Sequence, residues 1–265
     1  MAPLVAAPPK HLLQVADFDR GQLEELLGLA TRMKTDALGW RNAHAGQTLA
    51  CVFGKPSPRT RLSLAVAAQR LGMLPLTLRS DELRLGYVDA IAVAGLAQVE
   101  VQRLSAAAAV PVINAGSDDH HPCQALAGLL TVRERFGRIE GLKLAYAGGA
   151  LNIAHSLMQA SALFGMDFTM ANAAGCRPQA EVLIRAHALA ERCGGSVDLV
   201  AGPEVAVKGA NVVYTDAGLE VTADLMARAA HDAILMQRRP AQSGCEVATQ
   251  QALIHTLIHG WTSGV

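Results

Sequence analysis

The chain is poor in aromatic residues and in charge of either sign. Only 4% of its 265 residues are aromatic and 17% are charged. Lys+Arg and Asp+Glu number 23 each, so the formal net charge is +0. Without a basic excess or a basic run, nothing indicates a nucleic-acid or anionic-membrane partner. Apolar residues nevertheless make up 51% of the chain, which predicts a folded protein with a full core.

Cysteine pairs and long apolar runs are also missing. The five cysteines are odd in number and form no C-x-x-C pair, which argues against a disulfide framework or a zinc ribbon. The segment Met1 to Pro9 has neither a basic stretch nor a continuous apolar stretch, so we expect no signal peptide. No apolar run is long enough to span a bilayer, and reduced thiols in the cytoplasm are the simple expectation.

Strand-like and helix-like segments alternate along the chain in two blocks. This alternation predicts an α/β fold with two doubly wound parallel-sheet domains, joined by helices, and an inter-domain cleft. We place the domains at residues 1–136 and 137–265, and we expect the last helix, about 247–259, to pack back on the first domain. Ligands in such folds bind outside the carboxyl ends of the strands.

A first motif, Lys55-Pro56-Ser57-Pro58-Arg59-Thr60-Arg61, follows the apolar run 48–53 and opens a predicted helix, 58–71. Unpaired N–H groups at a helix N-terminus suit a phosphate, and hydroxyl side chains add donors. Arg59 adds a planar fork that can hold two phosphate oxygens. The motif therefore predicts an anion site. A capped helix with a surface arginine and no ligand would have the same sequence pattern.

A second motif, His120-His121-Pro122-Cys123-Gln124-Ala125-Leu126, begins another predicted helix about sixty residues later. Two adjacent histidines invite a metal hypothesis, but no further ligand has a suitable spacing, so we predict no metal. His255 and His259 lie one helical turn apart without the glutamate of H-E-x-x-H. We interpret that pair as an ordinary helix face.

Together the two motifs resemble the carbamoyl-phosphate site of the aspartate/ornithine carbamoyltransferase family, and most closely its ornithine branch. The resemblance implies that Ser57, Arg59 and Thr60 bind the phosphate. It implies that His121 donates to the carbamoyl oxygen and that Gln124 accepts from the carbamoyl nitrogen. Arg59, His121 and Gln124 are then the candidate catalytic residues.

The resemblance continues through the second half of the chain. Asn152 matches the asparagine that holds the amino acid in ornithine enzymes, and Asp216 ends a strand whose aspartate faces the substrate amine. The family implies direct carbamoyl transfer to ornithine or a related amino acid, giving citrulline and phosphate, without a metal or organic cofactor. It further implies a place in arginine biosynthesis and a homotrimer assembled through the first domain.

Several positions depart from the family pattern. Pro58 replaces a threonine of the phosphate loop, and Ala94 replaces an arginine. About fifteen residues are missing before Gly86, and the Ser-Met-Gly loop expected after Asp216 is absent. The family's His-Cys-Leu-Pro stretch reads Gln237-Arg238-Arg239-Pro240, which makes Arg238 and Arg239 candidate compensating cations.

These departures leave two functions open. The first is an active carbamoyltransferase that acts on carbamoyl phosphate and an amino acid. The alternative is a catalytically degenerate relative that binds a phosphate-bearing metabolite or serves as a regulatory or structural subunit. Catalytic turnover would support the first function, and binding without turnover would support the second.

Overall fold

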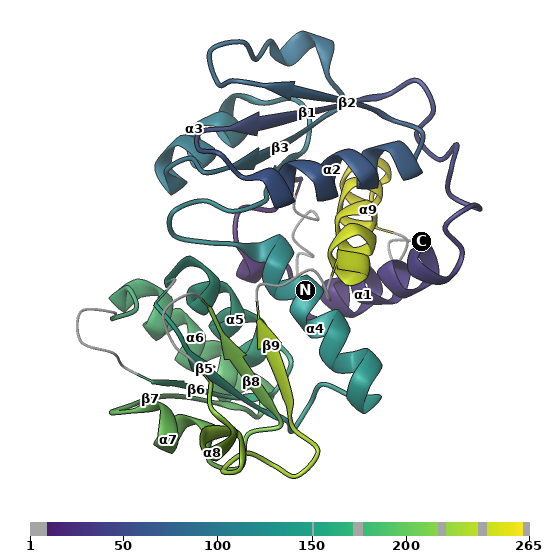
Figure 1. The fold of residues 1–265 in the computed structure, drawn as a ribbon. Coiled ribbons are helices and arrows are strands. Elements are labelled where there is room, and N and C mark those ends of the chain that lie inside the picture. Colours follow the sequence, from purple (N-terminus) through teal and green to yellow (C-terminus); the bar gives the residue numbers. More distant parts are fainter. Residues whose placement is uncertain (1–9, 150, 172–176, 217–220, 238–242, 262–265) are drawn as a thin grey trace, which may run out of the picture.

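The computed structural model describes residues 10–149, 151–171, 177–216, 221–237 and 243–261, and within them the chain forms two parallel sheets. The prediction of an α/β fold with two parallel sheets is confirmed. Figure 1 shows the sheets as separate units, each with helices beside it. The division into domains at residue 136 itself stays a prediction.

The first sheet has the order β2-β1-β3-β4, with every neighbouring pair parallel. Its inner strands are almost continuously apolar and buried, as expected for a parallel sheet covered on both faces. The strands are β1 (Thr48–Phe53), β2 (Leu74–Leu78), β3 (Ala90–Ala94) and β4 (Val112–Asn114).

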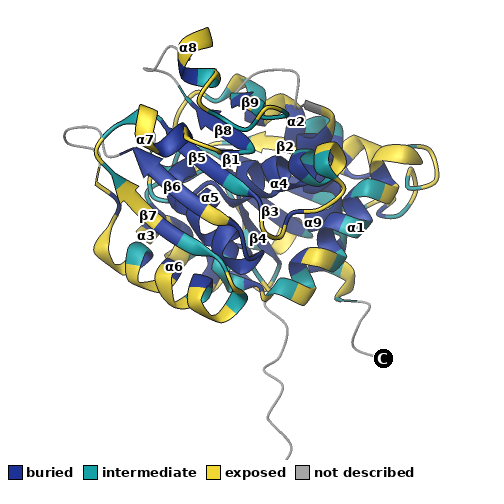
Figure 2. Ribbon diagram, turned by 90° about the horizontal axis from the view of Figure 1, so that it is seen from below, coloured by how far each residue is buried: buried dark blue, intermediate teal, exposed yellow. Residues whose placement is uncertain are grey.

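The second sheet has the order β7-β6-β5-β8-β9, again with every pair parallel. Figure 2 shows β5 and β6 deeply buried, whereas α6 (Ala180–Cys193) is exposed along one side. Val182, Ala186 and Ala190 recur every four residues on the covered side of α6. The strands are β5 (Lys143–Ala147), β6 (Asp167–Ala171), β7 (Ser196–Val200), β8 (Val212–Thr215) and β9 (Ile234–Gln237).

The remaining helices precede, connect or follow these strands. Most lie close to their predicted positions, but α7 was missed, because five residues are too few to show a helical period. The helices are α1 (Arg20–Thr35), α2 (Pro58–Arg70), α3 (Gln98–Ala107), α4 (Pro122–Phe136), α5 (Leu151–Leu163), α7 (Pro203–Val207), α8 (Ala223–Met226) and α9 (Ser243–His259), with 3₁₀ turns at Val15–Asp17 and Leu85–Tyr87.

The last helix, α9, lies beside the first sheet's helices although it follows the second sheet in sequence. It packs against α1, α2 and α4, and Figure 1 shows it in yellow among them. Ala248, Ala252 and Leu253 are fully buried, as are the polar side chains of Thr249 and Gln251. Because α9 is buried on most sides, it needs neighbouring helices on most sides, and α1, α2 and α4 are these neighbours.

Candidate active site

A cavity of about 780 Å³ opens at the carboxyl ends of β1, β3 and β4. β1 and β3 are neighbours, but their connections leave toward opposite edges of the sheet, and such a switch point is where open α/β sheets bind ligands. The two strand ends approach closely, because a Cβ on Gly54 would lie 2.5 Å from the carbonyl oxygen of Gly95. Gly95 itself has a φ of +72°, which favours glycine.

The N-terminus of α2 forms one wall of this cavity. Ser57 occupies the N-cap position and Pro58 the first helical position, as the sequence predicts. The Ser57 side chain makes no capping hydrogen bond within the described part of the chain, so its hydroxyl can donate to a ligand in the cavity. Thr60 also lines the cavity and is otherwise buried. This end of α2 therefore offers hydroxyl and backbone donors in one place.

Two buried side chains, those of Gln124 and Glu246, contact the Arg59 guanidinium and orient it. Its Nη2 donates to Oε1 of Gln124 at 2.6 Å, and its Nε lies 3.6 Å from Oε2 of Glu246 in α9. The Glu246 side chain is only 4% exposed and also accepts from the Ser63 hydroxyl at 3.3 Å. The Arg59 side chain keeps 30% exposure and lines the cavity, so a cation is presented to a ligand in a fixed orientation.

Gln124, predicted to contact the carbamoyl group, lies beside Arg59. Its side chain is buried and does not line the cavity, and its amide oxygen is taken by Arg59. In this structure Gln124 orients the arginine, and the expected contact with a carbamoyl nitrogen would require that hydrogen bond to be exchanged.

His121 lies at the N-cap of α4 on the opposite wall of the cavity. Its backbone N–H donates to the Ser156 hydroxyl of α5 at 2.8 Å, which ties the start of α4 to the second sheet's first helix. The imidazole lies against Gly116, where an added Cβ would be 3.0 Å from Cδ2 and Nε2. Gly116 has a φ of +130°, so both its backbone and its missing side chain are needed there.

The loop between β4 and His121 is fixed by a buried amide. Asn114 is fully buried; its Oδ1 accepts from the Gly116 N–H at 2.9 Å and its Nδ2 donates to the Ser117 hydroxyl at 3.2 Å. From α5, Nδ2 of Asn152 donates to the Ser117 carbonyl at 2.8 Å. Asn152 thus lines the cavity and joins the two halves of the chain.

The adjacent histidines face different cavities. His120 lines a separate cavity of about 360 Å³ together with Gln102 and Arg185. Burial lowers the pKa of His120 to about 4, and its buried Nδ1 has no hydrogen-bond partner among the described residues. His120 and His121 therefore do not line one cavity together.

Asp216 follows β8 at the switch point of the second sheet, where β5 and β8 are neighbours. Its carboxylate accepts from the Tyr146 hydroxyl at 2.6 Å and from the Gly149 N–H at 2.9 Å. A Cβ on Gly148 would lie 2.4 Å from Asp216 Oδ1, so glycine is required beside the carboxylate. Asp216 does not line the 780 Å³ cavity.

The structure brings most of the predicted site residues together and leaves two untested. Ser57, Arg59, Thr60, His121 and Asn152 line one cavity. Arg238 and Arg239 lie outside the described residues. Sequence reasoning missed Glu246, whose signal was a lone acidic residue at the start of a helix without other acidic residues.

The fold and the cavity define a class of α/β protein. It has two parallel sheets, and at one switch point a helix N-terminus, two hydroxyls, an arginine and an imidazole line one cavity. Comparison with known families makes this specific. Residues 10–134 match the carbamoyl-P binding domain of aspartate/ornithine carbamoyltransferase, and residues 140–220 match its Asp/Orn binding domain. The chain belongs to the aspartate/ornithine carbamoyltransferase family.

Individual relatives agree with this placement. The chain is 39% identical to an ornithine carbamoyltransferase of Symbiobacterium thermophilum, over 91% of this chain and 89% of that one. The crystal structure of ornithine carbamoyltransferase from Gloeobacter violaceus has a TM-score of 0.88 at 35% identity, covering 95% of this chain and 99% of that one. The enzyme from Pyrococcus furiosus has a TM-score of 0.88 at 32% identity, covering 98% of both chains.

Across the described residues, every helix is too short or too polar to cross a membrane.

Proposed function

We propose that the protein is an ornithine carbamoyltransferase, which transfers the carbamoyl group of carbamoyl phosphate to the amine of ornithine and releases citrulline and phosphate. The observation that carries this proposal is the convergence of Ser57, Arg59, Thr60 and His121 on one cavity at a switch point. The relatives at 39% and 37% identity are named ornithine carbamoyltransferases, which supports ornithine as the acceptor.

In this proposal the phosphate binds at the N-terminus of α2. Backbone N–H groups and the hydroxyls of Ser57 and Thr60 donate to its oxygens, and Arg59 adds charge-assisted hydrogen bonds. Glu246 and Gln124 keep the guanidinium in place, so little side-chain entropy is lost on binding. When the phosphate leaves and its negative charge increases, the same donors still form hydrogen bonds to its oxygens.

The unprotonated amine attacks the carbamoyl carbon and the carbon–oxygen bond to phosphate breaks. The proton that the amine loses is taken up by the departing phosphate. His121 donates to the carbamoyl oxygen, where negative charge grows during the attack. Asn152 and Asp216 would place the amino acid, because they follow the neighbouring strands β5 and β8 of the second sheet. Holding both substrates together supplies much of the acceleration.

We further propose that residues 1–136 bind carbamoyl phosphate and residues 137–265 bind the amino acid. A homotrimer in the cytoplasm is part of the same proposal. Nothing in the comparisons favours the alternative of a catalytically degenerate regulatory subunit.

The test is a citrulline assay on the purified chain with carbamoyl phosphate and ornithine, run beside calorimetric binding of carbamoyl phosphate. We expect binding and citrulline formation that depends on both substrates. Aspartate in place of ornithine is the acceptor control and should give no product. Binding without citrulline would reject ornithine as the acceptor, and no binding at all would reject the carbamoyltransferase reaction.

Pro58 gives a prediction that tests the phosphate loop by gain of function. Pro58→Thr restores one backbone N–H and one hydroxyl at the wall of the cavity, where proline has neither. One charge-assisted hydrogen bond contributes about 1.5–3 kcal/mol, so we expect the KM for carbamoyl phosphate to fall about tenfold or more. Steady-state kinetics at saturating ornithine measures this value.

Pro203→Thr is the matched control, because Pro203 also occupies the first turn of a helix but lies in α7. The control should leave the KM unchanged. An unchanged KM in Pro58→Thr as well would mean that this end of α2 does not contact the phosphate.

A further inference from the structure

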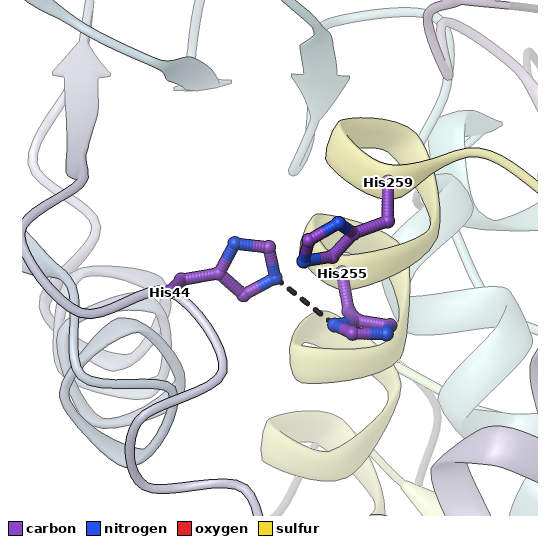
Figure 3. Close-up of side chains that lie close together, drawn as sticks. All are labelled: His44, His255 and His259. Atoms are coloured by element: carbon purple, nitrogen blue, oxygen red, sulfur yellow. Dashed lines mark hydrogen bonds between the residues drawn. The ribbon is translucent and has the colours of Figure 1, made fainter.

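Three histidines meet at the C-terminal end of α9, away from the cavity described above. His255 and His259 lie one turn apart on α9, and His44 approaches them from the segment before β1; Figure 3 shows the three rings facing one another. One nitrogen from each ring lies within 4.8 Å of the other two. Nε2 of His44 is 3.0 Å from Nδ1 of His255.

This spacing is close to that of a metal site. Zinc binds histidine nitrogen at about 2.0–2.1 Å, so two ligands of a tetrahedral site lie roughly 3.4 Å apart. The His44–His255 pair would have to separate by only about 0.4 Å, well within side-chain adjustment. His255 and His259 also have the i, i+4 spacing that places two ligands on one helix face.

A neighbouring amide determines which ring nitrogen of His44 carries the proton. Its Nδ1 is 2.5 Å from Oε1 of Gln47, and because an amide oxygen only accepts, Nδ1 carries the proton. Nε2 of His44 is then the nitrogen with the free lone pair, and it is the one that faces the other two rings. Metal-bound histidines are oriented in the same way by an acceptor on the second nitrogen.

Burial favours the neutral imidazoles of His44 and His255, which is the form of histidine that binds a metal ion. Burial lowers the pKa of His44, and burial together with the nearby His44 and His259 lowers that of His255 to about 4. The hydrogen bond to Gln47 and the charge of Asp89 raise the pKa of His44 and so oppose the effect of burial. Trp40 packs edge-on against His255. His259 stands in the last turn of α9, where the helix dipole attracts positive charge.

We propose that His44, His255 and His259 form a Zn²⁺ site, with water in the fourth position. His44 is buried and His259 is exposed, so the ion would be reached from the solvent side of His259. When zinc binds, the proton on Nδ1 of His255 moves to Nε2, and no further group is needed. The ion fastens the C-terminal end of α9 to the segment before β1. The inference does not rest on the proposed reaction.

The test uses the full chain, first stripped with EDTA and then titrated with ZnCl₂ by calorimetry. We expect one ion per chain with a dissociation constant in the micromolar range or tighter. His44→Ala and His259→Ala should abolish this binding. His231→Ala is the matched control, because that side chain is 97% exposed and remote from the cluster in sequence, and it should bind zinc like the parent.

A second readout identifies the ligands. Co²⁺ should give the intense visible bands of a tetrahedral ion bound by nitrogen, and these should disappear in His259→Ala, whose exposed position makes misfolding improbable as a cause. Near-ultraviolet thiolate bands would instead place the metal on cysteine and overturn the proposal. Binding that survives in both His44→Ala and His259→Ala, or no stoichiometric binding at all, would also overturn it.

Gln47→Leu tests the orienting amide separately from the ligands. We expect it to weaken zinc binding by about 10- to 100-fold without abolishing it. A hundredfold excess of zinc over its dissociation constant should raise the Tm of the parent chain by roughly 5 °C and leave that of His259→Ala unchanged. Equal affinity in Gln47→Leu and the parent would contradict the proposed arrangement.

Discussion

Replacing His121 by alanine is expected to lower kcat for citrulline formation by about 10²- to 10³-fold, the usual effect of losing one oxyanion donor. His121 lines the cavity from the wall opposite α2 and is held by the Ser156 hydroxyl and by Gly116. The donor acts mainly on the transition state, so the KM for carbamoyl phosphate should change far less than kcat.

His120→Asn is the matched control for this prediction. His120 is the adjacent residue, but it lines the separate 360 Å³ cavity, so kcat should stay within about threefold of the parent value. Both variants should have the circular dichroism spectrum of the parent, which checks that they fold. A similar loss in both variants would show that damage to the loop, and not the missing imidazole, causes the effect.

Arg59→Ala has the second large expected effect, a fall in kcat/KM for carbamoyl phosphate of about 10²- to 10⁴-fold. The estimate follows from two charge-assisted hydrogen bonds of about 1.5–3 kcal/mol each. The same change should also lower the free energy of unfolding, because the buried Glu246 carboxylate loses its guanidinium partner. Kinetics and urea unfolding measure the two effects separately.

A double variant separates these two consequences. In Arg59→Ala with Glu246→Gln the buried group is neutral, so stability should recover in part while kcat/KM stays low. Arg70→Ala, on the exposed last turn of the same helix, is the charge control and should keep full activity. If activity recovers together with stability in the double variant, Arg59 does not contact the phosphate.

The fold and half of the site follow from local patterns in the sequence. Alternating apolar runs and helical periods predict the two parallel sheets, and parallel strands end at one edge. A motif such as Ser57-Pro58-Arg59-Thr60 that directly follows a buried strand must therefore lie at that edge. His121 is placed in the same way, because it follows β4 after a short loop.

The missed features all depend on contacts between distant parts of the chain. Glu246 reaches Arg59 only because α9 returns to the first sheet, and His44 joins His255 for the same reason. A helix face with two histidines is ambiguous until its neighbour is known. Gln124 lies in the expected motif, but its rotamer depends on the arginine that it meets.

The path of α9 also affects how the chain can fold during synthesis. Domains usually fold in order as they leave the ribosome. Here the helices around the first sheet lack a central partner until α9, Ser243–His259, has been made, after all strands of the second sheet. The surfaces of α1, α2 and α4 that pack on α9 therefore stay uncovered while the second sheet is being synthesised, so the first half of the fold is completed only after the strands of the second.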